Sequence, residues 1–119
     1  MSYILFAEDD QISLELIQEM LEVQGFTVET ANNGVDALAI ALDKKPSLLL
    51  LDIMMPLKSG LQVTQAVKAH YGDDAPPVIL ITALGSLEDI EQGRLAGADD
   101  YIIKPFSPEV LHQKIDAAL

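Results

Sequence analysis

Four consecutive leucines run directly into an acid in the stretch Leu48-Leu49-Leu50-Leu51-Asp52-Ile53-Met54-Met55-Pro56. An unbroken apolar run of this length is typical of a strand buried on both faces of a parallel sheet. Three other apolar runs also end on polar groups: residues 3–7 stop at Glu8-Asp9-Asp10, residues 78–81 at Thr82 and residues 101–103 at Lys104. If the four runs are parallel neighbours, these side chains meet at one edge of the sheet, where open α/β sheets bind ligands.

Helical patterns separate these strands. Apolar residues recur three and four positions apart in several segments, which predicts amphipathic helices whose stripes face the sheet. The expected stripes are Ile12, Leu16, Ile17, Met20 and Leu21; Val35, Leu38, Ala39 and Leu42; Val63, Ala66, Val67 and His70; and Leu111, Ile115 and Ala118. Residues 26–30 read as a shorter and more polar strand, which suits a sheet edge.

Strands that alternate with helical segments of about ten residues predict right-handed crossovers and a parallel sheet. The expected fold is α/β: a doubly wound, five-stranded parallel sheet in the order 2-1-3-4-5 with helices on both faces, as in flavodoxin-like proteins. The most polar strand then lies at an edge, and the topological switch point falls between strands 1 and 3. Glu8, Asp9 and Asp52 are expected to meet in that crevice.

The helix ends carry their own signals. Asp10 is expected to cap the first helix, and Ser107-Pro108-Glu109 supplies a cap, a first-turn proline and an acid for the last helix. Residues 86–89, Ser-Leu-Glu-Asp, resemble a capping box that opens the fourth helix. Gly93 weakens that helix by about 1 kcal/mol relative to alanine, and Gly97 is expected to end it.

Length and composition limit the function. The 119 residues suit one domain, 1–119, and half of them are hydrophobic, so a packed core is expected. The formal net charge of -12 argues against direct binding to nucleic acid or an anionic membrane, and favours cations and basic protein faces. Cysteine is absent, and no apolar run is long enough for a signal peptide or a membrane span, so the expected location is cytoplasmic.

The expected acidic edge needs a compensating charge. At an effective dielectric constant near 20, two carboxylates about 4 Å apart repel each other by roughly 4 kcal/mol. A divalent cation with oxygen ligands, Mg²⁺ or alternatively Mn²⁺, would relieve this repulsion. Zinc is disfavoured, since cysteine is absent and neither His70 nor His112 lies near the edge. A carboxylate beside a hard cation can also attack phosphorus and form an aspartyl phosphate, with Lys104 and Thr82 contacting the phosphoryl oxygens.

The whole chain resembles the receiver domain of bacterial two-component response regulators. The resemblance is carried, in order and at family-like spacing, by Ile4-Leu5-Phe6-Ala7-Glu8-Asp9-Asp10, Leu50-Leu51-Asp52-Ile53-Met54-Met55-Pro56, Ile79-Leu80-Ile81-Thr82-Ala83 and Gly97-Ala98-Asp99-Asp100-Tyr101-Ile102-Ile103-Lys104-Pro105-Phe106. It implies a signalling module that is not an enzyme, apart from catalysing its own phosphorylation and dephosphorylation. The implied phosphodonor is the phosphohistidine of a sensor histidine kinase or a phosphotransfer protein.

The resemblance also implies roles for individual residues. Asp52 is the expected phosphoacceptor, and Lys104, joined to the following proline by a cis bond, is expected to hold the phosphoryl oxygens. Mg²⁺ is expected on Asp9, Asp52 and the Met54 backbone carbonyl, with Glu8 acting through water. The apolar Met54 side chain cannot orient a water molecule, so it is not expected to shorten the phosphoryl lifetime.

A conformational change is expected to transmit the signal from Asp52 to a partner. In the family pattern Thr82 turns toward the phosphoryl group while Tyr101 moves inward, which alters the surface formed by residues 86–97, 101–103 and 107–118. That surface is the expected contact for a downstream protein or an output domain. A phosphorylation-dependent dimer is left open as an alternative.

The dimer typical of the winged-helix transcription-factor branch is not favoured. That branch pairs basic with acidic residues across this surface, and Asp99, Asp100 and Lys114 keep part of the pattern. Ile90, however, stands where a basic residue is typical, and Asp116 is acidic where that branch tends to be basic. An exposed Ile90 suits a hydrophobic contact instead.

Three other functions share parts of the pattern. A hydrolase or phosphatase with an aspartyl nucleophile would want a second acid two residues after Asp52, where Met54 stands. A flavin or nucleotide site would want glycine- or hydroxyl-rich turns, whereas the first turn here is Glu8-Asp9-Asp10 and would repel a phosphate. A receiver-shaped binding module that works without phosphorylation is less favoured, because every reactive position is filled.

Overall fold

Five parallel strands form one sheet in the order β2-β1-β3-β4-β5. The computed structural model describes residues 2–83 and 87–119. Its strands are β1 (Ile4–Ala7), β2 (Val28–Ala31), β3 (Leu48–Asp52), β4 (Val78–Thr82) and β5 (Asp100–Ile103). The predicted fold class and strand order are therefore confirmed. The edge strand β2 differs most in its bounds, since it covers residues 28–31 rather than 26–30, whereas the ends of the other strands lie within one residue of the predicted runs.

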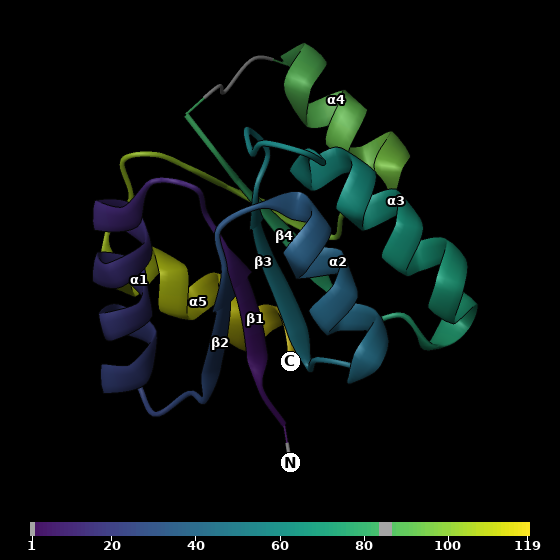
Figure 1. The fold of residues 1–119 in the computed structure, drawn as a ribbon. Coiled ribbons are helices and arrows are strands. Elements are labelled where there is room, and N and C mark those ends of the chain that lie inside the picture. The colour runs from purple at the N-terminus through teal and green to yellow at the C-terminus, as the bar shows by residue number, and fades with distance from the viewer. Residues whose placement is uncertain (1, 84–86) are drawn as a thin grey trace.

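Helices cover both faces of the sheet (Figure 1). Helices α1 (Gln11–Val23) and α5 (Pro108–Ala118) lie on one face. Helices α2 (Gly34–Asp43), α3 (Gly60–Tyr71) and α4 (Leu87–Ala96) lie on the other, and a short 3-10 turn, η1 (Gly72–Asp74), follows α3. Within the described ranges, no helix has both the length and the apolar character needed to cross a membrane.

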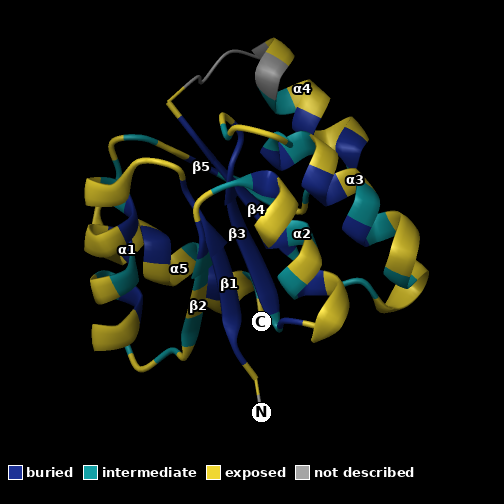
Figure 2. Ribbon diagram, viewed as in Figure 1, coloured by how far each residue is buried: buried dark blue, intermediate teal, exposed yellow. Residues whose placement is uncertain are grey.

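The central strands form the core. Figure 2 shows the central strands β1, β3 and β4 buried along their length, while the edge strand β2 and the outer faces of the helices are more exposed. All four leucines of β3 are fully buried. Removing one leucine side chain from water contributes about 1.5–3 kcal/mol to folding, so this run alone anchors the middle of the sheet.

The buried face of α1 differs from the predicted stripe. Leu14, Ile17 and Leu21 face the sheet, whereas Ile12 and Leu16 are 78% and 58% exposed. Both sets have helical spacing, so periodicity alone could not decide which side of the helix packs inward. The prediction chose the wrong face at Ile12 and Leu16 and omitted Leu14.

Helix α2 shows the same kind of correction. Its buried residues include Ala37 and Ala41, whereas the predicted Val35, Ala39 and Leu42 lie on the exposed side. The helix packs closely against its surroundings, so small residues suit the contact better than large ones. In α3, Val63 and Val67 are buried as expected, but His70 is exposed.

The helix termini follow the predicted signals. The Asp10 carboxylate accepts a hydrogen bond of 3.0 Å from the Ser13 backbone N–H and so caps α1. Ser107 caps α5, with Pro108 as its first residue. Gly97 has a φ of +108° immediately after α4, which is the left-handed conformation of a helix stop. The predicted capping box at residues 86–89 begins outside the described residues.

Candidate functional site

The strand register brings four polar strand ends to one edge of the sheet. Ala7 pairs with Leu51, so the next residues, Glu8 and Asp52, leave the sheet at the same level. Thr82 ends β4 and pairs with Ile103, so Lys104 follows directly beyond this pair. The convergence predicted from the apolar runs is therefore present in the fold.

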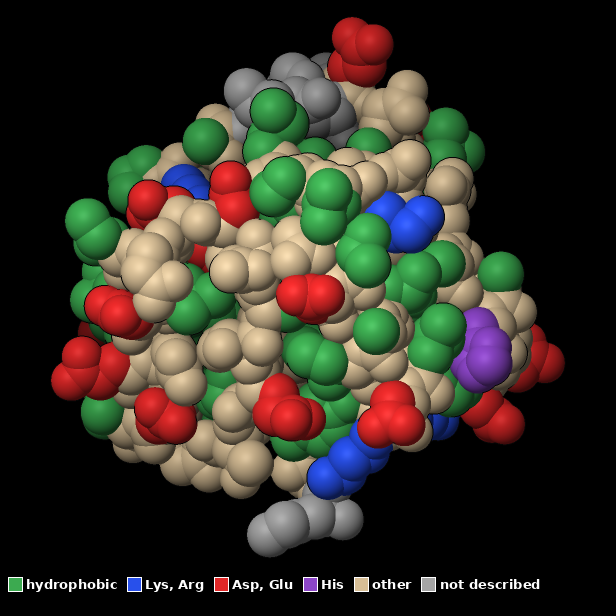
Figure 3. Space-filling model, in the orientation of Figure 1, with side chains coloured by type: hydrophobic (Ala, Val, Ile, Leu, Met, Phe, Trp, Pro, Cys, Tyr) green, Lys and Arg blue, Asp and Glu red, His purple; other side chains and the backbone are tan. Residues whose placement is uncertain are grey.

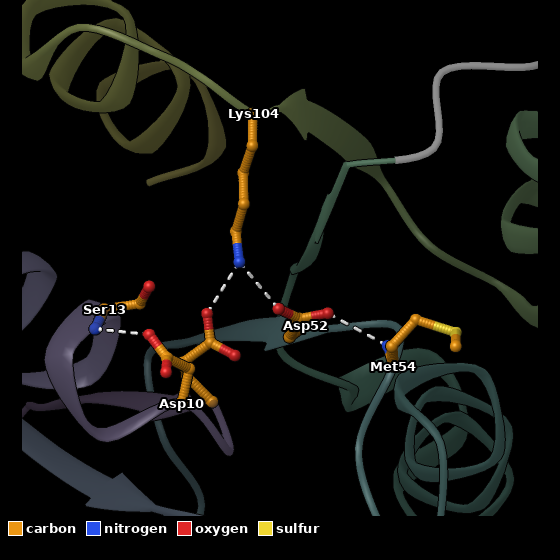
Figure 4. Close-up of polar contacts among 6 residues, drawn as sticks. Asp10, Ser13, Asp52, Met54 and Lys104 are labelled. Atoms are coloured by element: carbon orange, nitrogen blue, oxygen red, sulfur yellow. Dashed lines mark hydrogen bonds and ion pairs between the residues drawn. The ribbon is translucent and has the colours of Figure 1, made fainter.

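Lys104 binds two acids at this edge. Its Nζ lies 2.7 Å from Glu8 Oε1 and 2.8 Å from Asp52 Oδ2. Figure 4 shows the Lys104 side chain extended from the end of β5 toward Asp52. The other oxygen of Asp52, Oδ1, accepts a hydrogen bond of 2.9 Å from the Met54 backbone N–H. These contacts fix the orientation of the Asp52 carboxylate.

The two acids carry more negative charge than Lys104 can neutralise. Glu8 is only 2% exposed, and the Asp52 side chain is 9% exposed. Burial raises the pKa of Glu8 from 4.5 to about 7; the neighbouring Asp52 acts in the same direction, while Lys104 opposes the rise. Burial works to lower the pKa of Lys104, but the hydrogen bonds and charges of Asp52 and Glu8 outweigh it, and the pKa of Lys104 is raised. The two buried acids therefore share the single positive charge of Lys104.

Asp9 lies apart from this ion-pair cluster. Its side chain is exposed, and no hydrogen bond or ion pair among the described residues involves it. In residues 2–83 and 87–119, no three Asp, Glu, His or Cys side chains come close enough together to hold a metal ion by themselves. The predicted magnesium set also uses the Met54 carbonyl and water, so it remains a prediction. The predicted donors suit Mg²⁺ chemically, because carboxylate, carbonyl and water oxygens are the hard ligands that this ion prefers.

Thr82 and Tyr101 lie on the same face of the sheet. Tyr101 pairs with Leu80 and Ile103 pairs with Thr82, so the two residues are one step apart along that face. Thr82 is fully buried at the end of β4. Tyr101 is half-buried, and its hydroxyl donates a hydrogen bond to the Ile90 carbonyl in α4. Burial raises the pKa of the Tyr101 hydroxyl, which keeps it a proton donor.

The loop after Asp52 is held by two glycines, Gly34 at the start of α2 and Gly60 at the start of α3. The Gly60 N–H donates to the Ile53 carbonyl at 3.0 Å, and the Gly34 N–H donates to the Pro56 carbonyl at 3.2 Å. A Cβ atom at Gly34 would lie only 1.9 Å from the Lys58 carbonyl oxygen. No motif in the sequence predicted that Gly34 positions this loop. The available signal was a glycine at the first residue of a predicted helix, directly after a capping asparagine.

Two ion pairs lie at or beside the predicted output surface. Lys114 Nζ in α5 lies 2.9 Å from Asp100 Oδ1, and Lys68 Nζ lies 2.8 Å from Asp99 Oδ2. Ile90 is partly exposed in α4. Because Asp99 already accepts hydrogen bonds from Lys68 and from the Val78 N–H, it serves the fold of a single chain.

Acidic side chains predominate over basic ones on the face shown in Figure 3. This agrees with a formal net charge of -12. Met54 is 66% exposed beside Asp52, so its side chain does not close the site. A buried carboxylate oriented by a lysine and open on one side can act as a nucleophile toward phosphorus in an approaching molecule.

Comparisons with known proteins agree with this geometry. A family model described as the response regulator receiver domain matches residues 4–116. The chain is 42% identical over 119 residues to the transcriptional regulatory protein CpxR of Escherichia coli K12, a match that covers 100% of this chain and 50% of CpxR. The chain thus spans about half the length of the curated relatives it matches.

Two solved structures extend the comparison to the fold. Chemotaxis protein CheY4 of Vibrio cholerae superposes with a TM-score of 0.92 at 28% identity, covering 100% of this chain and 99% of that protein. The receiver domain of the Pseudomonas aeruginosa sensor histidine kinase PA1611 superposes with a TM-score of 0.91 at 27% identity, covering 98% and 96%. That domain has a magnesium ion coordinated in its active-site cleft.

Proposed function

The chain belongs to the response regulator receiver domain family, and we propose that it accepts a phosphoryl group on Asp52 and signals through the resulting change. The observation that carries this proposal is the contact of Lys104 with both Glu8 and Asp52. It places a fixed positive charge beside a buried carboxylate at the open edge of the sheet. A phosphohistidine of a kinase or phosphotransfer protein is the proposed donor.

The transfer needs little from the protein beyond positioning and charge. An Asp52 oxygen forms a bond to phosphorus while the bond from phosphorus to the donor nitrogen breaks. Lys104 then binds an oxygen of the phosphoryl group. This negatively charged oxygen would replace the Glu8 carboxylate as a partner of Lys104. The Met54 N–H holds the other Asp52 oxygen during the approach.

We propose Mg²⁺ as the cofactor. Asp9, Asp52 and the Met54 backbone carbonyl would hold it, and Glu8 would act through water. When bound, the ion would offset negative charge on the transferred phosphoryl group. The support in this chain is that Glu8 and Asp52, both buried, have only the one charge of Lys104 between them, so a cation would supply the balancing charge when both acids are ionised.

The proposed output is a change at α4, β5 and α5. Thr82 would turn toward the phosphoryl group and Tyr101 would move inward on the face that both share. CpxR is a transcriptional regulatory protein, so we propose control of transcription as the process. The strongly acidic chain would act there through a protein contact rather than on DNA directly.

Binding of beryllofluoride, a phosphoryl mimic, tests this proposal. Isothermal titration calorimetry of the wild-type chain should show binding in the presence of Mg²⁺ and none after chelation with EDTA. The Asp52→Asn variant should not bind, whereas Asp116→Asn, a change at an exposed acid of α5, should bind as the wild type does. Binding that persists in Asp52→Asn or without Mg²⁺ would contradict the proposal. It would favour a receiver-shaped module that works without phosphorylation.

A further inference from the structure

Gly93 allows Tyr101 to lie directly on the backbone of α4. A Cβ atom at Gly93 would be 2.6 Å from Tyr101 Oη, 2.7 Å from Tyr101 Cε1 and 2.9 Å from Leu80 Cδ1. Carbon and oxygen atoms do not approach this closely without a bond, so no larger residue fits while the ring keeps its position. Gly93 is also buried, although it lies in the middle of a helix.

The same helix supplies a polar contact for the ring. The Tyr101 hydroxyl donates a hydrogen bond to the Ile90 carbonyl, which lies one turn before Gly93. The ring is therefore held by packing on Gly93 and by a hydrogen bond to Ile90. Together these two interactions form the Tyr101–α4 contact.

No local backbone requirement explains this glycine. The glycines with positive φ among the described residues are Gly25, Gly72 and Gly97, so Gly93 keeps ordinary helical geometry. Glycine in a helix interior costs about 1 kcal/mol relative to alanine. Close packing of the Tyr101 ring, with Leu80 beside it, accounts for this cost.

Loss of the Tyr101–α4 contact would affect the face that carries Thr82. The Tyr101 side chain lies one step along the sheet from Thr82, which is fully buried at the end of β4. A ring displaced from α4 can stay on this face by rotating about its own side-chain bonds. Under the proposed switch, in which Tyr101 moves inward as Thr82 turns, the contact with α4 and the position nearer Thr82 would be two alternative positions for one side chain.

We propose that Gly93 is a positioning residue that holds Tyr101 on α4. In this way it sets how tightly the Asp52 site binds a phosphoryl group or its mimic. This inference rests on the proposed function for its effect on signalling, but the position of the ring does not depend on it. The three atoms nearest to a methyl group at position 93 all belong to the outer ends of side chains, those of Tyr101 and Leu80, and none is a backbone atom. The substitution Gly93→Ala should therefore displace the ring while the fold is kept, and it should also favour the helical conformation of α4.

The first test follows the ring itself, without any phosphoryl mimic. The chain has three tyrosines, so ¹³C labelling of their rings yields three sets of NMR signals, which single Tyr→Phe variants assign. Gly93→Ala should shift the Tyr101 signals and leave those of Tyr3 and Tyr71 in place. Gln92→Ala, an exposed neighbour in α4, is the matched control and should shift none of them. Unchanged Tyr101 signals in a folded Gly93→Ala protein would overturn the inference, as would an unfolded protein.

The second test measures the effect on the site. Calorimetry of beryllofluoride binding with Mg²⁺ is compared among the wild type, Gly93→Ala, Tyr101→Ala and the double variant. If the Tyr101–α4 contact holds the resting state, Gly93→Ala should raise the affinity about fivefold or more. The same substitution should change nothing in the Tyr101→Ala background. An equal effect in both backgrounds would assign the change to a stiffer α4 and contradict the inference. Failure of the wild type to bind beryllofluoride would instead contradict the proposed function and leave the NMR result standing.

Discussion

Lys104 and Asp52 are 52 residues apart in the sequence, yet Lys104 Nζ lies 2.8 Å from Asp52 Oδ2. Their strands, β5 and β3, are not neighbours, because β4 lies between them. The long lysine side chain reaches across the end of β4 and joins the two. The site therefore depends on the whole strand order and not on any local motif.

Loss of the Lys104 charge should weaken both the fold and the site. In Lys104→Met, Glu8 and Asp52 lose the positive charge that they share, so the metal-free protein should lose about 2 kcal/mol or more of unfolding free energy at pH 8. Beryllofluoride affinity should fall at least about tenfold, which is about 1.4 kcal/mol. Urea unfolding and calorimetry measure the two effects.

Lys114→Met is the matched control for that variant. Lys114 pairs with Asp100 in an ion pair that is partly exposed on both sides. Loss of this ion pair should lower the unfolding free energy by less than about 1 kcal/mol and leave beryllofluoride binding unchanged. Equal losses in the two variants would argue that Lys104 has no special place in the site.

The dependence of the unfolding free energy on pH should reflect the ionisation of Glu8. Its pKa is raised from 4.5 to about 7 by burial, so the folded protein holds a proton that the unfolded chain releases. The associated stabilisation is fully present below about pH 4.5 and is lost as the pH rises through about 7, with a total of at most about 3 kcal/mol. Without Mg²⁺, urea midpoints should fall over this window in the wild type. Glu8→Gln should flatten the fall; an identical profile would mean that another group is responsible.

The two sides of α1 should respond very differently to truncation. Leu14 is buried against the sheet, so Leu14→Ala should cost about 2–4 kcal/mol by creating a cavity. Leu16 is mostly exposed, so Leu16→Ala should stay within about 0.5 kcal/mol of the wild type. Thermal or urea unfolding distinguishes them, and a larger loss at Leu16 would show that the helix packs on its other face.

A methyl group at Gly34 should be far more harmful than one at Gly93. The atom in its way is the Lys58 backbone carbonyl oxygen, at 1.9 Å, which cannot swing aside as a side-chain tip can. Gly34→Ala should cost about 2 kcal/mol or more despite the helical preference of alanine. It should also weaken Mg²⁺ binding measured by calorimetry, because the displaced loop contains Met54. Unchanged stability would imply that the loop has another stable position.

The strand ends could be predicted from the sequence because two simple signals coincide there. Each central strand is a nearly solid apolar run, and each run stops at a charged or hydroxyl-bearing residue such as Asp52 or Lys104. Parallel pairing follows from the intervening helices. Once the order is known, the meeting of Glu8, Asp52 and Lys104 follows without any knowledge of side-chain packing.

The helix faces and the close contacts could not be predicted in the same way. In α1, the spacing of Ile12 and Leu16 fits a helix as well as that of Leu14 and Ile17, and only packing selects one set. Gly93 was interpreted as a weak point of its helix. Its contact with Tyr101 depends on how closely α4 approaches β5, a distance that no sequence pattern reports.

Intact-protein mass spectrometry after incubation with acetyl phosphate tests the central claim most directly. With Mg²⁺ present, the wild-type chain should gain one phosphoryl group that peptide mapping assigns to Asp52. The gain should be absent after chelation with EDTA and absent in Asp52→Asn. A wild-type chain that stays unmodified, or an Asp52→Asn chain modified to the same extent, would contradict the account.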